Sequence, residues 1–157
     1  MADEIHYLTP EGLKENEKRL DFLRNVRRQE VAERLRLALE EGGELVENAE
    51  YEDAKNEQAF IEGEIMRLEM ILSNAQLIDE NGPKDIVGLG DRVTVQEVGT
   101  DMLEVYILVG AVEANPRAGK ISHKSPLGRA LMDRHVGDRV MVEAPDGDIE
   151  FEIKGIE

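Results

Sequence analysis

The sequence contains no cysteine and no tryptophan, and three tyrosines and three phenylalanines are its only aromatic residues. The absence of cysteine excludes disulfides, thiolate zinc sites and cysteine nucleophiles. No apolar run approaches the roughly 18 residues that a membrane-spanning helix needs. The first ten residues, MADEIHYLTP, lack the basic and apolar regions of a signal peptide, so we expect a cytoplasmic protein.

Positive charge is also scarce. Lys and Arg number 19 against 35 Asp and Glu among the 157 residues, which gives a formal net charge of −16. A freestanding nucleic-acid binder must neutralise phosphates with cations, so this balance argues against independent binding to DNA or RNA. The excess is uneven, because residues 37–64 contain ten carboxylates and one lysine. A solvated helix face is the ordinary explanation for such a run, and composition leaves it open beside a functional one.

The first half of the sequence predicts two long helices. Thr9 is a suitable N-cap and Pro10 a suitable first residue for a helix that continues to about residue 41, where Gly42-Gly43 ends it. Its apolar residues are mostly spaced by three, four or seven. This stripe, which Arg27 interrupts, consists of Leu13, Leu20, Leu23, Val31, Leu35, Ala38 and Leu39.

A second helix is predicted from Asn48, as N-cap, to about residues 74–76. Its stripe consists of Ala54, Ile61, Ile65, Leu68, Leu72 and Ala75. Two helices with one narrow apolar stripe each, joined by a short turn, are expected to pair antiparallel as a projecting hairpin. The acidic turn around residues 42–48 then forms the tip. A rigid arm or dimerisation rod with a soluble end remains an alternative.

The second half changes to an alternating pattern that is typical of strands. Strands are predicted at residues 92–98, 103–109, 138–144 and 149–153, with a turn at 145–148 and a short helix from Ser125-Pro126 to about Arg134. In that helix Leu127, Ala130 and Leu131 face inward. The predicted fold class is therefore α+β, with a helical hairpin over residues 1–78 and an antiparallel sheet with one short helix over 79–157.

Several segments of this sequence occur in a known family. They are Leu8–Gly12 (LTPEG), Glu41–Tyr51 (EGGELVENAEY), Gln58–Gly63 (QAFIEG), Leu72–Ala75 (LSNA), Ile121–Leu131 (ISHKSPLGRAL) and Pro145–Gly147 (PDG). With these segments the chain resembles the Gre transcript cleavage factors over nearly its whole length, and most closely their GreA type. The resemblance implies an N-terminal coiled-coil hairpin followed by an FKBP-like domain, similar to FK506-binding proteins.

The resemblance also implies an activity. In this family the C-terminal domain docks at the rim of the secondary channel of bacterial RNA polymerase, and the hairpin enters the channel. Two tip carboxylates then help to bind a second Mg²⁺ at the polymerase active centre, where the polymerase cleaves the 3′ end of backtracked RNA. Such a factor is not itself an enzyme, and its Mg²⁺ is bound jointly with the polymerase rather than by the free protein. It meets nascent RNA only inside that complex, and neither DNA nor a membrane is an expected partner.

The resemblance assigns the two tip carboxylates to Glu44 and Glu47. The family usually has Asp at the first position, so Glu44 is one methylene longer. Mg²⁺ prefers oxygen ligands in near-octahedral geometry, which makes that extra length matter. Our hypothesis is that Glu47 is the stronger ligand, whereas Glu44 positions the water or serves as a second ligand.

Two further sets of residues are candidates for binding. Lys124, Ser125, Pro126 and Leu127 open the short helix and are the candidates for docking on the polymerase, although Pro126 also suits a helix start without any partner. Glu40 and Glu41 precede the turn, so Arg34 and Arg36 are the nearest cations for an RNA contact.

Two rival functions remain open at this stage. A Gre-like inhibitor would plug the same channel without stimulating cleavage; the longer Glu44 allows this, whereas the Glu-Asn-Ala-Glu-Tyr segment argues against it. A peptidyl-prolyl isomerase or chaperone would need an apolar pocket with aromatic walls. From residue 80 onward the only aromatic residues are Tyr106 and Phe151, and both are expected in the core.

Overall fold

The computed structural model describes residues 4–42 and 49–157, and side chains at all of these except 41 and 42. The chain divides into two compact units. One unit, the hairpin unit, is Leu13–Asn74. The other, the sheet unit, combines Ala75–Glu157 with the described part of residues 1–12. We describe each unit separately.

The assignment of the N-terminal segment differs from the boundary predicted at residue 78. Strand β1 (His6–Leu8) pairs in parallel with β2 (Ala75–Leu77), which follows the second long helix. The Ile78 amide also donates a hydrogen bond to the Leu8 carbonyl at 2.8 Å, and the Leu8 side chain is fully buried. These contacts join residues distant in sequence, so local patterns gave no sign of them.

A carboxylate further strengthens the attachment of this segment. The Thr9 amide donates to Glu113 Oε2 at 2.7 Å, and the Thr9 hydroxyl donates to Glu113 Oε1 at 2.6 Å. The same hydroxyl accepts a hydrogen bond from the Gly12 amide at 3.0 Å, which confirms Thr9 as an N-cap. The Tyr7 ring meets the His123 ring edge-on, with 5.6 Å between the ring centroids.

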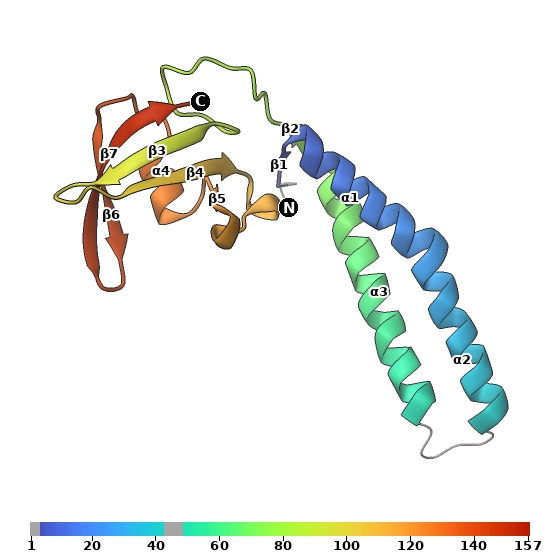
Figure 1. The fold of residues 1–157 in the computed structure, drawn as a ribbon. Coiled ribbons are helices and arrows are strands. Elements are labelled where there is room, and N and C mark those ends of the chain that lie inside the picture. Colours follow the sequence, from blue (N-terminus) through green and yellow to red (C-terminus); the bar gives the residue numbers. More distant parts are fainter. Residues whose placement is uncertain (1–3, 43–48) are drawn as a thin grey trace. The chain divides into compact units, whose positions relative to one another are not determined.

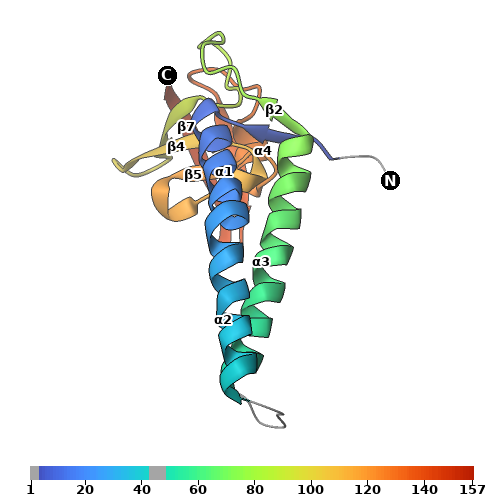
Figure 2. The ribbon, with the colours of Figure 1, turned by 90° about the vertical axis from the view of Figure 1, so that its right-hand side faces the viewer.

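The hairpin unit consists of two helical limbs. The first limb comprises α1 (Pro10–Phe22), the π-helical segment η1 (Leu23–Arg27) and α2 (Arg28–Gly42), and the second limb is α3 (Ala49–Ser73). Helices α2 and α3 run side by side in both views (Figures 1 and 2). The predicted helical hairpin is therefore confirmed. None of the described helices is long and apolar enough to cross a membrane.

The hairpin seam is close to the predicted pair of stripes. Its buried residues are Leu20, Leu23, Val31 and Ala38 from the first limb and Ala54, Ile61, Ile65, Leu68 and Ile71 from α3. One prediction at its edge was wrong, because Leu39 is 54% exposed. Leu72 packs against the seam as predicted, and the neighbouring Ile71 is buried as well.

The π-helical segment also departs from the prediction of one continuous α-helix. In it the Arg28 amide donates to the Leu23 carbonyl, five residues back. Leu23 and Val31 are eight residues apart, and an α-helix turning about 100° per residue would place them about 80° apart around its axis. The wider π turn absorbs one extra residue and keeps both side chains in the seam. The interruption of the stripe at Arg27 was the visible sign of this shift.

Ion pairs between the limbs engage three carboxylates of the acidic run, Glu57, Glu62 and Glu64. The pairs are Arg19–Glu64, Arg24–Glu69, Arg27–Glu57, Arg28–Glu62 and Arg34–Glu57. Exposed pairs of this kind contribute only about 0–1 kcal/mol each, so their main effect is on the register of the two limbs. The carboxylates of α3 thus belong partly to a structural charge pattern.

The sheet unit contains a five-stranded sheet in the order β5-β4-β3-β7-β6. Its strands are β3 (Arg92–Glu97), β4 (Leu103–Val109), β5 (Lys120–Ser122), β6 (Arg139–Ala144) and β7 (Gly147–Ile156). All neighbours are antiparallel except β4 and β5, which are parallel. Sequence analysis missed β5, because three residues are too few for an alternating pattern. With this correction the α+β class is confirmed.

Helix α4 (Pro126–Leu131) packs on the core of the sheet unit. Two 3₁₀ segments, η2 (Ala111–Glu113) and η3 (Pro116–Ala118), precede it in the chain. Leu131 is fully buried, and Leu127 and Ala130 pack against the same core, as predicted. The helix ends at Leu131 rather than near Arg134. Met132 leaves the helical conformation (ψ 138°), and Asp133 has a left-handed backbone with φ 64°.

Candidate functional site

The two candidate metal ligands, Glu44 and Glu47, lie outside the described residues. In sequence they fall between Gly42, the last residue of α2, and Ala49, the first residue of α3. The described ends of the two limbs are therefore joined by the segment that contains both carboxylates. Among the described residues no group of three or more His, Cys, Asp or Glu side chains is arranged to bind a metal ion. The metal-binding role of Glu44 and Glu47 stays a prediction.

The predicted docking residues run from the loop after β5 (Lys124 and Ser125) into the first turn of α4 (Pro126 and Leu127). Ser125 has an extended backbone (φ −70°, ψ 160°), and its hydroxyl accepts a hydrogen bond from the Gly128 amide at 3.0 Å. The same hydroxyl donates to the Ser122 carbonyl at 2.7 Å. Pro126 is exposed at the first turn of the helix, whereas Leu127 is partly buried against the core. The hydroxyl of Ser125 therefore ties the start of α4 to the end of β5.

Replacing Ser125 with alanine is expected to destabilise the sheet unit by about 1 kcal/mol, since the Gly128 amide loses its cap. Urea unfolding followed by NMR signals of the sheet core measures this loss. The control is Ser125→Thr, which keeps a hydroxyl and should recover most of the stability. Equal losses in the two variants would contradict the capping role.

Lys124 is already engaged by a carboxylate of the same unit. Its ammonium lies 2.6 Å from Glu4 Oε1, and both side chains are exposed. The hydrogen bond from Lys124, together with its charge, holds the pKa of Glu4 below its usual value. The Lys124 carbonyl accepts a hydrogen bond from Arg129 Nε at 2.9 Å. An acidic partner at this loop would have to displace Glu4 in order to reach the lysine.

A shallow hollow beside this loop adds residues that the sequence analysis did not select. It measures about 350 Å³ and is lined by Pro126, Arg129, Met141 and Glu143. Met141 is 56% exposed on β6, between the buried residues Val140 and Val142. The alternation along β6 would have revealed Met141 as an outward apolar residue, but it gave no sign that β6 lies next to α4.

The two candidate RNA contacts are both bound to carboxylates within the hairpin unit. Arg34 pairs with Glu57, which Arg27 also contacts. Arg36 donates to Glu33 at 3.0 Å and to Glu40 at 2.6 Å, and its hydrogen bond to Glu33 raises the pKa of Arg36. A phosphate would therefore compete with existing ion pairs at either position. An RNA contact of Arg34 or Arg36 stays a prediction.

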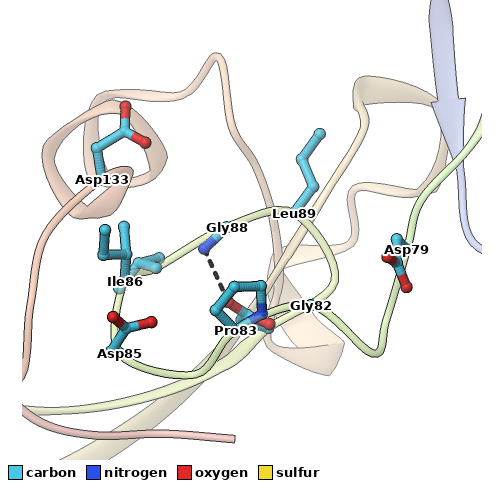
Figure 3. Close-up of a pocket in the computed structure, with 10 residues that line it drawn as sticks. Asp79, Gly82, Pro83, Asp85, Ile86, Gly88, Leu89 and Asp133 are labelled. Carbon is cyan, nitrogen blue, oxygen red and sulfur yellow. Dashed lines mark hydrogen bonds between the residues drawn. The ribbon is translucent and has the colours of Figure 1, made fainter.

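Another hollow lies along the segment after β2, at the start of the sheet unit (Figure 3). It measures about 540 Å³, and its walls include Pro83, Ile86, Leu89 and the carboxylates of Asp79, Asp85, Asp91 and Asp133. Asp91 is buried and satisfied, because it pairs with Lys84 at 2.6 Å and accepts a hydrogen bond from the Gly88 amide at 2.8 Å. The acidic residues here thus include a structural ion pair that anchors the linker.

The geometry of the sheet unit argues against an isomerase. Phe151 is buried in the core, as predicted, and no aromatic residue of this unit lines either of the two hollows just described. Tyr106 packs partly against the same core and donates a hydrogen bond to Glu104 at 2.7 Å. Burial, with a smaller contribution from Glu104, raises the pKa of Tyr106 to about 12.

The two units together define a class of protein in which a helical hairpin with an acidic connection is combined with a small α+β domain. Comparison with protein families identifies that class. The family model for the N-terminal domain of transcription elongation factors matches residues 6–77, and the model for the GreA/GreB C-terminal domain matches residues 82–157. The chain belongs to the GreA/GreB family of transcription elongation factors and is of the GreA type.

Individual relatives agree with this assignment. Transcription elongation factor GreA of Clostridium botulinum (strain Kyoto / Type A2) is 47% identical over 94% of this chain and 92% of its own length. GreA of Clostridium perfringens (strain SM101 / Type A) is 45% identical over 99% of both chains.

Solved structures of related factors also align with the chain. GreA factor homolog 1 of Thermus thermophilus is 32% identical, with 98% of this chain and 99% of that chain covered and a TM-score of 0.45. The GreA/GreB factor of Nitrosomonas europaea is 23% identical, with 66% of this chain and 93% of that chain covered and a TM-score of 0.44.

Proposed function

We propose that this protein binds bacterial RNA polymerase in the cytoplasm and stimulates the polymerase's own cleavage of backtracked RNA. The hairpin enters the secondary channel, and the loop of Lys124, Ser125, Pro126 and Leu127 docks at the channel rim. The observation that supports the proposal is the antiparallel hairpin. Its first limb ends at Gly42, and its second limb begins at Ala49. Between them the sequence places Glu44 and Glu47, where the family has its tip carboxylates.

The chemistry of RNA cleavage explains why carboxylates are needed at this position. Cleavage of a phosphodiester by two metal ions requires one ion at the attacking oxygen and another at the leaving oxygen. Carboxylate oxygens are ligands that Mg²⁺ prefers, so Glu44 and Glu47 would help the polymerase to bind its second ion. The free protein supplies ligands rather than a complete site, and it acts as a factor and not as an enzyme.

The dimensions of the hairpin suit such a role. Helix α3 has 25 residues and extends for about 37 Å at ~1.5 Å per residue. The seam and the ion pairs between the limbs keep this length stiff, because they connect the limbs at several points along it. A stiff arm can deliver two carboxylates to a distant metal site without a large loss of conformational entropy on binding.

The experiment that tests the proposal uses a backtracked elongation complex of bacterial RNA polymerase with labelled RNA. Addition of this protein and Mg²⁺ is expected to shorten the RNA from its 3′ end, faster than Mg²⁺ alone. A protein that binds the polymerase and slows elongation without shortening the RNA would instead be a channel inhibitor. That result would overturn the proposal.

A further inference from the structure

Helix α3 has a second apolar face on the side opposite the hairpin seam. We define this outer face of α3 by Ala59, Phe60, Gly63, Met66, Arg67 and Met70, which recur at three- and four-residue spacing. Among the described large hydrophobic side chains, the three most exposed are Phe60 (71%), Met70 (64%) and Met66 (63%). All three lie on this face. Isolated exposed apolar residues are ordinary, but such a cluster on one helix face indicates an interaction surface.

The outer face is also hollowed. A depression of about 520 Å³ is lined by Ala59, Phe60, Gly63 and Arg67, with Arg19 and Glu64 at its edge. Glu64 accepts hydrogen bonds from Arg19 at 3.0 and 3.3 Å, so its charge is already compensated. The hollow therefore has apolar walls and offers no uncompensated carboxylate.

Arg67 gives this face a free positive charge. The six arginines of the first limb, from Arg19 to Arg36, all pair with carboxylates of the hairpin unit. Of the hairpin arginines that the structure describes, Arg67 alone has no ion pair. An exposed, unpaired arginine beside apolar side chains matches a protein surface that supplies one carboxylate.

Gly63 has no packing role inside the described hairpin. Apart from the adjacent residues and the nearby backbone of α3 itself, a Cβ atom built at this position would meet no described atom within 4 Å. Glycine in the interior of a helix is less favourable than alanine, so the hairpin would be more stable without it. A glycine in the floor of an apolar hollow does, however, allow a partner to approach the helix backbone closely.

We propose that the outer face of α3 docks against the polymerase, on an apolar protein surface with a carboxylate opposite Arg67. This inference rests on the proposed function, which places the hairpin inside a protein channel. RNA is a poorer occupant, because Arg67 is the one cation among the six residues that define this face, and a single cation neutralises few phosphates. A second copy is poorer too. Two chains of net charge −16 repel each other, and six residues are far fewer than the roughly 20–30 a side of a stable interface.

The test measures how RNA cleavage in the backtracked complex depends on the concentration of the factor. For the double variant Phe60→Gln/Met66→Gln, the factor concentration needed for half-maximal RNA cleavage is expected to be about ten times that of the wild type. An effect of this size is typical when residues at the centre of an interface are replaced. Its cleavage rate at saturation should equal that of the wild type, because Glu44 and Glu47 are unchanged. Val26→Gln is the matched control. Val26 is 42% exposed on the first limb, away from this face, and its replacement should change neither quantity.

Gly63→Ala separates docking from a structural role. This variant should raise the melting temperature of the hairpin by about 2–6 °C, because alanine is more favourable than glycine inside a helix. It should nevertheless raise the factor concentration needed for half-maximal RNA cleavage about threefold or more. A stabilised variant with the wild-type concentration dependence would overturn the close approach at Gly63.

The remaining outcomes are also decisive. If Phe60→Gln/Met66→Gln shows the same concentration dependence as the wild type, the proposed docking surface is wrong.

If the wild type stimulates no cleavage, the proposed function fails. The docking surface is then still tested with the same variants, by measuring the binding of fluorescently labelled factor to the polymerase. A wild-type dimer in sedimentation equilibrium that the double variant abolishes would assign the face to a second copy instead.

Discussion

Replacing Glu47 with glutamine is expected to reduce the stimulated rate of RNA cleavage about 100-fold, because a metal ligand contributes several kcal/mol to the stabilisation of the transition state. Glutamine keeps the size of the side chain and removes its charge, so the variant isolates the effect of the carboxylate. Glu44→Gln is expected to have a smaller effect, about tenfold, because we assign Glu44 the position of a second or water-positioning ligand. The measurement is the shortening of labelled RNA in a backtracked complex at saturating factor.

The dependence on Mg²⁺ gives this prediction a second readout. Glu47→Gln should need a higher Mg²⁺ concentration for half-maximal cleavage and should still compete with the wild type for the polymerase. The matched controls are Glu50→Gln and Glu52→Gln in the first turn of α3, which are exposed and expected to retain the wild-type rate within about twofold. Full stimulation by Glu47→Gln would show that the metal-ligand assignment is wrong.

Replacing Gly128 with alanine is expected to destabilise the sheet unit by about 3 kcal/mol or more and to lower its melting temperature by more than about 10 °C. An added Cβ would lie 2.0 Å from the Ser122 carbonyl oxygen and 2.9 Å from His123 Cα. Both are backbone atoms, so no side chain can move away to make room. The first turn of α4 would have to separate from the end of β5, where the Ser125 hydroxyl now connects them.

The consequence for function follows from the position of this contact. Gly128 lies within α4, directly after the predicted docking residues, so its replacement should also weaken binding to the polymerase. The control is Gly155→Ala in β7, where an added Cβ meets no described atom within 4 Å and the effect on unfolding should be small. Urea unfolding compares the two variants. Equal stabilities would contradict the close approach of α4 to Ser122.

Sequence patterns were sufficient for features that depend on near neighbours along the chain. The Thr9 cap, the end of the first limb at Gly42 and the inward side chains of α4 were all predicted, because caps, glycine stops and helical spacing are local properties. The four longer strands were predicted for the same reason. The resemblance of segments such as EGGELVENAEY also led to the family, which the comparisons confirmed.

Features that depend on contacts between distant residues appeared only in the tertiary structure. The pairing of β1 with β2 moves the N-terminal segment into the sheet unit, and the parallel strand β5 is too short to have a pattern of its own. The ion pairs between the limbs occupy Arg34, which sequence reasoning had left free for RNA. Which charged residues pair across a hairpin depends on the register of its two limbs, and the positions of the charged residues in the sequence do not determine that register.

The outer face of α3 illustrates the same division. The stripe that the sequence predicted for the seam is the one that the hairpin covers, whereas the second apolar face of α3 was not recognised from the sequence. The hairpin buries Ile61, Ile65 and Leu68 against the first limb and leaves Phe60 and Met66 in solvent. Local spacing therefore determined the elements, and the resemblance of sequence segments led to the family. Packing between distant residues decided which side chains remain available for a partner.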